Sequence, residues 1–143
     1  MQLSPHFTLE EFCASATLDT YNELVMSFDQ ILNNPSQAEI DWMKYLCVNV
    51  LEPLRAEINH PIYINSGYRC PRLNSMVGGT LNSQHQYGQA ADIRLINNED
   101  ALKIFSILRN NKFVDLAFLE KRVSGVQWIH VSVAPVPRNK YIV

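Results

Sequence analysis

The stretch SQHQYGQAAD, residues 83–92, carries the strongest signal of fold and chemistry in this chain. His85 stands in a polar loop, and Asp92 follows at the start of a strand-like run, with Gly88 between them. A loop of this length can fold back, so that an imidazole nitrogen and a carboxylate oxygen reach one cation at about 2 Å each, which suits zinc. The stretch therefore predicts two ligands of a metal site.

A third ligand has to come from elsewhere in the chain. The run QWIHVSV, residues 127–133, offers His130, and strand alternation places Trp128, His130 and Ser132 on one face. Three protein ligands with a fourth position left open are typical of a catalytic rather than a structural zinc site. The same residues also fit a hydrogen-bonded core histidine and a carboxylate that caps a turn. The pattern alone leaves both interpretations open.

Two segments before these motifs predict helices. Thr8 is expected to cap a short helix in which Glu11 occupies the third position. The run 36–58 places apolar residues at helical spacing, which predicts the longest helix of the chain. Pro53 lies late in this run and predicts a kink or a helix end near Glu52.

The remaining segments predict an α+β domain with a small antiparallel sheet flanked by helices. We expect strands at 61–65, 90–95, 114–119 and 127–133, short helices near 72–76 and 98–109, a hairpin through 121–125, and an irregular tail from Pro135.

Size and composition predict one domain over residues 1–143. The 47% hydrophobic content supports a single core, and 12 Lys and Arg against 14 Asp and Glu give a net charge of −2 without any block of like charge. This balance predicts no nucleic-acid partner. Cys13, Cys47 and Cys70 are expected to be reduced, largely buried thiols.

The opening residues lack the pattern of a signal peptide, and no stretch approaches the roughly 20 apolar residues of a membrane span. We therefore expect cytoplasmic synthesis, no membrane insertion and a monomer.

The pattern SxHxxGxAxD, followed by WIHVSV, resembles the zinc D-Ala-D-Ala carboxypeptidase family of metallopeptidases, and its small phage and prophage-associated members most of all. The resemblance also covers LSPHFTLEEF, LEPLR and INSGYRCPRLNSMVGG, so it spans nearly the whole chain. It implies that His85, Asp92 and His130 bind zinc, Zn2+. It also implies the compact α+β fold shared with the hedgehog signalling domain, and cleavage of D-amino-acid-containing peptide bonds in peptidoglycan.

The resemblance suggests roles for three further residues. Arg69 resembles an arginine that faces the substrate carbonyl in related enzymes, where a guanidinium could stabilise an oxyanion or hold a carboxylate. It could instead bond the carbonyls of the neighbouring loop. Ser83 and Gln84 are expected either to hold the ligand loop in shape or to touch substrate.

The general base is the point at which the chain departs from several relatives. Such a base takes a proton from the attacking water, and in those relatives it is a Glu or Asp three residues before the last histidine. Gln127 stands there in this chain and can only orient water by hydrogen bonds. With Ser83 and Gln84, it is a candidate substrate-binding residue. Glu120 is the nearest acidic alternative, and its spacing from Asp115 resembles an acidic strand of phage-type members. Strand alternation puts these two carboxylates on opposite faces, so both cannot face the metal without a bulge. Glu120 could equally be a solvated charge.

Two functions compete. The first is an endolysin-like zinc metallopeptidase that hydrolyses peptidoglycan stem peptides, as a carboxypeptidase or endopeptidase, with Glu120 as base and Arg69 at the oxyanion. It would act on the cell wall after release or as part of a phage particle. The second, favoured by Gln127, is a catalytically impaired zinc-binding module with a structural or wall-binding role, for example in a virion.

Overall fold

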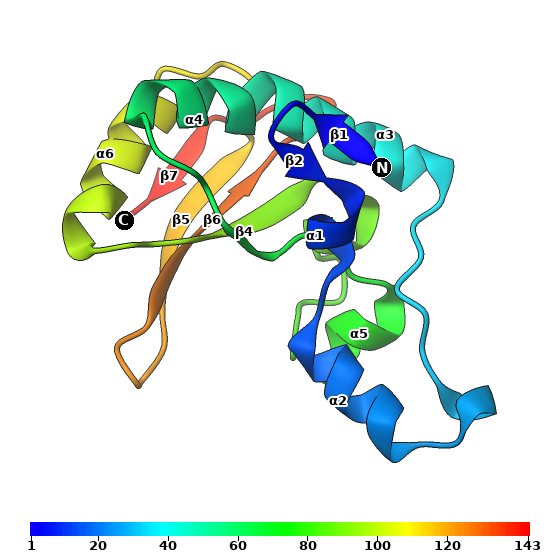
Figure 1. Cartoon of the computed structure of the whole chain (residues 1–143). Helices are drawn as coiled ribbons and strands as arrows, with labels where there is room; N and C mark the ends of the chain where they lie inside the picture. The colour runs from blue at the N-terminus through cyan, green and yellow to red at the C-terminus, as the bar shows by residue number, and fades with distance from the viewer.

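A five-stranded sheet forms the centre of the molecule (Figure 1). The computed structural model describes residues 1–143, apart from the side chains of residues 98 and 99. The strand order is β3 (Ile64–Ser66), β4 (Ala90–Arg94), β6 (Gln127–Ser132), β5 (Leu116–Lys121) and β7 (Lys140–Ile142). Neighbouring strands are antiparallel except β5 and β7, which are parallel. The predicted α+β class and flanking helices are confirmed.

Among the described residues, six α-helices and a two-stranded sheet surround this central sheet. The helices are α1 (Leu9–Cys13), α2 (Ala16–Leu24), α3 (Gln37–Leu46), α4 (Glu52–Ile58), α5 (Pro71–Met76) and α6 (Asn98–Leu108). Strands β1 (Gln2–Ser4) and β2 (Phe7–Thr8) form a separate antiparallel pair at the N-terminus. In Figure 1, α2 and α5 extend away from the sheet as an arm, while α3, α4 and α6 lie along it.

The long predicted helix is present, but Pro53 does not end it. Helices α3 and α4 are continuous through a π-helical turn, Cys47–Leu51. A proline has no N–H to donate to the carbonyl four residues earlier, which here is that of Asn49. The side-chain amide of Asn111 donates to this carbonyl at 2.8 Å. The helix therefore continues to Ile58 and ends at Asn59, whose left-handed φ of 60° closes it.

The predicted cap at Thr8 is confirmed. The Glu11 backbone N–H donates to Thr8 Oγ1 at 3.2 Å, and the Thr8 N–H donates to Glu11 Oε1 at 3.1 Å. This reciprocal pair satisfies two backbone donors that a helix start leaves without partners.

Two local predictions need correction, and two elements were not predicted. The strand expected at 61–65 forms at Ile64–Ser66, and neither α2 nor the β1–β2 pair was predicted. The Pro-rich tail is not irregular throughout, because Lys140–Ile142 adds a parallel edge strand. Asn139 turns the chain with a φ of 51°, and Lys140 N–H then donates to the carbonyl of Asp115 at 2.9 Å.

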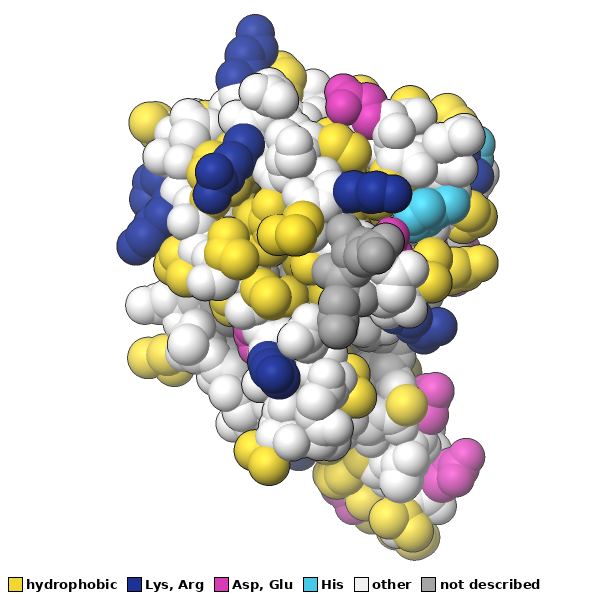
Figure 2. Space-filling model, turned by 90° about the vertical axis from the view of Figure 1, so that its left-hand side faces the viewer, with side chains coloured by type: hydrophobic (Ala, Val, Ile, Leu, Met, Phe, Trp, Pro, Cys, Tyr) yellow, Lys and Arg dark blue, Asp and Glu magenta, His cyan; other side chains and the backbone are white. Residues whose placement is uncertain are grey.

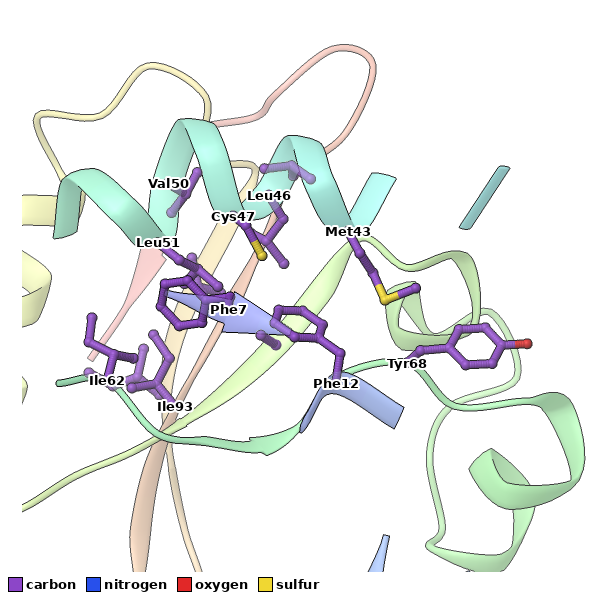
Figure 3. Close-up of a cluster of buried hydrophobic side chains, with 14 of the residues drawn as sticks. Phe7, Phe12, Met43, Leu46, Cys47, Val50, Leu51, Ile62, Tyr68 and Ile93 are labelled. Atoms are coloured by element: carbon purple, nitrogen blue, oxygen red, sulfur yellow. The ribbon is translucent and has the colours of Figure 1, made fainter. Parts of the chain in front are cut away.

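The hydrophobic core fills the space between the long helix, the N-terminal segment and one face of the sheet. Figure 3 shows side chains of the long helix reaching toward Phe7 and Phe12, which are fully buried. These two rings meet edge to face with centroids 6.5 Å apart. Ile93, Ile129 and Val131 close the core from the sheet. Burial on this scale is the main source of stability for a small domain.

The cysteines have the predicted environment. Cys47 and Cys70 are buried, Cys13 is half-buried, and all three are free thiols. On the face drawn in Figure 2, the described Lys and Arg side chains are dispersed among uncharged groups. Within the described part of the chain, no helix combines the length and apolar character needed to cross a membrane.

Candidate metal centre and cleft

Strand register brings two of the predicted ligands together. Asp92 of β4 lies directly opposite His130 of β6, and His130 lies opposite Phe118 of β5. Directly paired residues of antiparallel strands project from the same face. One face of the sheet therefore carries Asp92 and His130 side by side, and the other carries the apolar neighbours that belong to the core.

His85 reaches the same face from a tight 3-10 turn, Gln84–Tyr87. Ser83 Oγ accepts a hydrogen bond from the His85 backbone N–H at 3.3 Å. Gly88 ends the turn with a φ of 74°, and a Cβ there would lie 2.3 Å from the carbonyl oxygen of Glu39. Glycine is required at this position both by the backbone angle and by the close approach of α3.

A backbone carbonyl fixes the orientation of the His85 ring. His85 Nδ1 lies 2.7 Å from the carbonyl oxygen of Gly67, so the ring donates its Nδ1 proton there. The lone pair of Nε2 is then directed toward Asp92. An imidazole held in this way is pre-set as a metal ligand.

His85, Asp92 and His130 form one compact, buried cluster. Asp92 Oδ1 lies 3.2 Å from His85 Nε2 and 3.1 Å from His130 Nδ1, and the three ligand atoms all lie within 4.8 Å of one another. Ligands about 2.0–2.1 Å from a tetrahedral zinc ion are separated by about 3.3 Å. Two imidazole nitrogens and one carboxylate oxygen at these separations fit zinc.

Asp92 is charged in this environment. Burial alone would raise its pKa, but the close contacts with the rings of His130 and His85 outweigh that effect and hold the pKa well below its usual range. The second oxygen, Oδ2, accepts a hydrogen bond from Arg69 Nη2 at 3.2 Å. Because Arg69 occupies Oδ2, only Oδ1 faces the two histidines. Asp92 is therefore expected to bind a metal ion through one oxygen.

The Arg69 guanidinium is anchored on three sides. Besides Asp92, its Nε donates to Ser66 Oγ at 2.9 Å and its Nη1 donates to Asn74 Oδ1 at 3.3 Å. Burial lowers the pKa of Arg69, and the charges of Asp92 and Glu120 oppose that shift. The structure thus places Arg69 beside the cluster, where it holds the carboxylate of Asp92.

Asn74 is a supporting residue that no sequence pattern indicated. It is buried, and its amide donates to the carbonyl of Thr80 at 2.8 Å while its oxygen accepts from Arg69. A Cβ at Gly79 would lie 2.0 Å from Asn74 Oδ1. Gly79 is thus a glycine that the close approach of Asn74 requires.

The cluster lies on a cleft of about 1060 Å³. Its walls are the start of α2, the loop 77–84, the β5–β6 hairpin and Arg138 of the tail. Phe118 stacks on the His130 ring, with centroids 4.8 Å apart and planes at 28°. This stack orients the ring of His130, and it was not predicted because it depends on the long-range pairing of β5 with β6.

The structure separates the two acidic candidates of β5. Glu120 pairs with Trp128, projects from the same face as His130 and lines the cleft. Asp115 instead lies buried just before the first residue of β5 and accepts hydrogen bonds from Arg138.

Of the predicted substrate-binding residues, two line the cleft and one does not. Ser83 and Gln84 line the cleft, although their observed hydrogen bonds support the ligand loop. Gln127 pairs with Lys121 and, by alternation, projects from the face opposite His130. Gln127 is therefore not brought to the metal cluster.

Comparison with known proteins agrees with this geometry. The chain is 38% identical over 56 residues to a zinc D-Ala-D-Ala carboxypeptidase of Streptomyces albus G, a match that covers 39% of this chain and 22% of the relative. The match thus spans about a fifth of that relative's length, and the relative's name agrees with the predicted zinc cofactor. The family model described as peptidase M15 matches residues 6–132. The chain therefore belongs to the peptidase M15 family.

Proposed function

We propose that this chain is a zinc-dependent peptidase that hydrolyses a peptide bond in the stem peptides of peptidoglycan. The observation that carries the proposal is the cluster of His85, Asp92 and His130 at the wall of an open cleft, with a carboxylate, Glu120, on the same face. The name of the Streptomyces relative supports both the metal and the type of substrate.

In the proposed reaction, the residues of the site would have separate roles. Zinc held by the three ligands would supply a Lewis acid that polarises the scissile carbonyl and acidifies the attacking water. Glu120 would accept the proton of that water and return it to the leaving amine. Arg69 holds Asp92 in its ligand orientation, and an unused N–H of its guanidinium could stabilise the developing oxyanion.

The competing function is a zinc-binding module without catalysis. Its main support was Gln127 at the position of a base, but the side chain projects from the face opposite His130. A glutamine there neither replaces a base at the cluster nor blocks one. Glu120 is the residue on which the two functions now differ.

The test combines metal analysis with a peptidoglycan digest. Purified protein is expected to hold about one zinc per chain and to release new peptide fragments that mass spectrometry identifies, which also reports which bond is cut. Glu120→Gln should keep the zinc and lose at least about 100-fold in rate, as expected for general-base loss. Glu57→Gln, at an exposed position of α4, is the matched control. A zinc-loaded parent that releases nothing would leave the non-catalytic module as the function.

An endolysin-like role is the finer form of this proposal. It rests on the likeness of Asp115 and Glu120 to the acidic strand of phage-type members. Protein added to cells with a permeabilised outer layer should lower the turbidity of the suspension, and Glu120→Gln should not. Digestion of purified wall without any lysis of cells would count against this role while leaving the peptidase activity intact.

A further inference from the structure

The C-terminal segment lines the cleft beside the candidate metal cluster, although it lies beyond the family match, which ends at residue 132. After β6 the chain turns back, and β7 pairs with the outer edge of β5. The amide of Asn139 donates to the carbonyl of Val114 at 2.9 Å, which fixes the turn. This path places Arg138 beside the start of β5.

Arg138 binds Asp115 through three hydrogen bonds. Its backbone N–H and its Nε donate to Oδ1 at 3.0 and 2.9 Å, and its Nη2 donates to Oδ2 at 2.7 Å. The Asp115 side chain is 3% exposed, whereas that of Arg138 is 56% exposed. A buried carboxylate needs such partners, because burying it without them is costly. Arg138 therefore fixes where Asp115 can lie.

Asp115 in turn holds Gln84, the residue before ligand His85. Gln84 Nε2 donates to Asp115 Oδ2 and to the carbonyl of Val133, each at 3.1 Å. The amide nitrogen has two hydrogens, and both are used. Val133 N–H also donates to the carbonyl of Gln89 at 2.9 Å, so the ligand turn is tied down at both ends.

We propose that Arg138, Asp115 and Gln84 form a positioning relay through which the C-terminal segment sets the metal affinity of the site. Arg138 neutralises and orients Asp115, Asp115 orients the Gln84 amide, and Gln84 holds the turn that presents His85. None of the three is a catalytic residue in this scheme. The inference rests on the proposed role of His85 as a zinc ligand.

Arg138 also lines the cleft, which suggests a different role as a direct contact for a substrate carboxylate. The two roles predict different measurements. A substrate contact would change KM and leave metal affinity untouched. A positioning residue would change metal affinity in the absence of any substrate.

The experiment measures Zn2+ affinity by competition with a chromophoric chelator and records the visible spectrum of the Co2+-loaded protein. Arg138→Met removes the charge and the fork but keeps the aliphatic stem, and should weaken Zn2+ binding by about 10-fold or more, the range for a residue that supports a ligand. Arg138→Lys keeps the charge and should restore part of the affinity. Lys140→Met, at an exposed cation of the same segment, should bind like the parent.

Gln84→Ala tests the other end of the relay without unpairing Asp115. It should weaken Zn2+ binding, and the double variant with Arg138→Met should be no weaker than Gln84→Ala alone, because both act along one path. Should Arg138→Met fail to fold, Gln84→Ala decides by itself. Unchanged affinity and an unchanged Co2+ spectrum in the folded variants would overturn the relay. A parent that binds Zn2+ but digests no peptidoglycan would refute the proposed function and still leave the relay decided by these affinities.

Discussion

The two faces of the β4–β6 pair carry buried side chains of opposite kinds, apolar on one face and polar on the other. On one face, Ile129 and Val131 are fully buried and need only apolar neighbours of suitable size. On the other face, Asp92 and His130 are buried as well, yet each depends on named hydrogen-bond partners. The alternation of one strand therefore supplies stability from one side and chemistry from the other. Substitutions on the two faces should consequently have separable effects.

The largest effect is expected on the polar face, for Asp92→Asn. Asparagine keeps the shape of the side chain but loses the negative charge that lies between the two histidines. Loss of a residue that only supports a ligand weakens metal binding by roughly 10–100-fold, and the loss in Asp92→Asn should be larger. A chelator competition titration measures this change. Asp19→Asn, at an exposed position of α2, is the control. An unchanged affinity in Asp92→Asn would remove Asp92 from the ligand set.

The apolar face should respond in the opposite way. Ile129→Ala leaves a cavity in the core and should lower the free energy of unfolding by about 2–5 kcal/mol, measured by urea denaturation. The folded fraction should still bind Zn2+ like the parent. Val48→Ala, at a side chain 55% exposed, should change the free energy of unfolding by no more than about 0.5 kcal/mol. Parallel losses of stability and metal affinity in Ile129→Ala would show that the two faces are not separable.

The sequence predicted the strands of this pair well because their signals are local. Residues 90–95 and 127–133 alternate, and the structure has strands at Ala90–Arg94 and Gln127–Ser132. Alternation also put Asp115 and Glu120 on different faces before any pairing was known. The choice between them depended on the long-range pairing of Phe118 with His130, which no local pattern contains.

The residues that support the site could not be predicted from the sequence, because they too act through long-range contacts. Asn74 joins Arg69 to the loop at Thr80 through side-chain contacts, and Arg138 joins Asp115 across a turn in the Pro-rich tail. The tail was predicted to be irregular because prolines argue against strands. Its short strand lies at the sheet edge and begins after the last proline, where that argument no longer applies.

Two glycines with the same backbone angle offer a smaller and more local test of the polar face. Gly88 and Gly78 have φ values of 74° and 75°, but a Cβ would meet the carbonyl oxygen of Glu39 at 2.3 Å in the first and nothing within 4 Å in the second. Gly78→Ala should cost about 1–2 kcal/mol from the backbone alone. Gly88→Ala should cost more, because the ligand turn must also move away from α3.

Urea denaturation and Zn2+ titration separate these two glycines. Only Gly88→Ala should weaken Zn2+ binding, since only Gly88 ends the turn that presents His85. Equal effects of the two substitutions on both measurements would mean that the contact with Glu39 does not set the position of the ligand turn.

The smallest effect concerns the pH dependence of stability, and it distinguishes the carboxylate of the tail from that of the cluster. The hydrogen bonds from Arg138 outweigh the burial of Asp115 and lower its pKa. A carboxylate whose folded pKa is below its unfolded value, about 3.9 for Asp, binds fewer protons in the folded state. Its contribution to stability is therefore complete above about pH 5 and is lost as the pH falls through the folded pKa.

Urea denaturation of the metal-free protein between pH 7 and pH 3 measures this loss. Asp92 also has a lowered pKa, so the parent should lose stability on acidification through both carboxylates. Arg138→Met removes the main cause of the shift at Asp115 and leaves Asp92 in place, so its stability should fall less steeply below about pH 4. Lys140→Met should follow the parent curve. If Arg138→Met follows it too, the charge of Asp115 is held by other groups, and the tail contributes to the polar face only through its backbone.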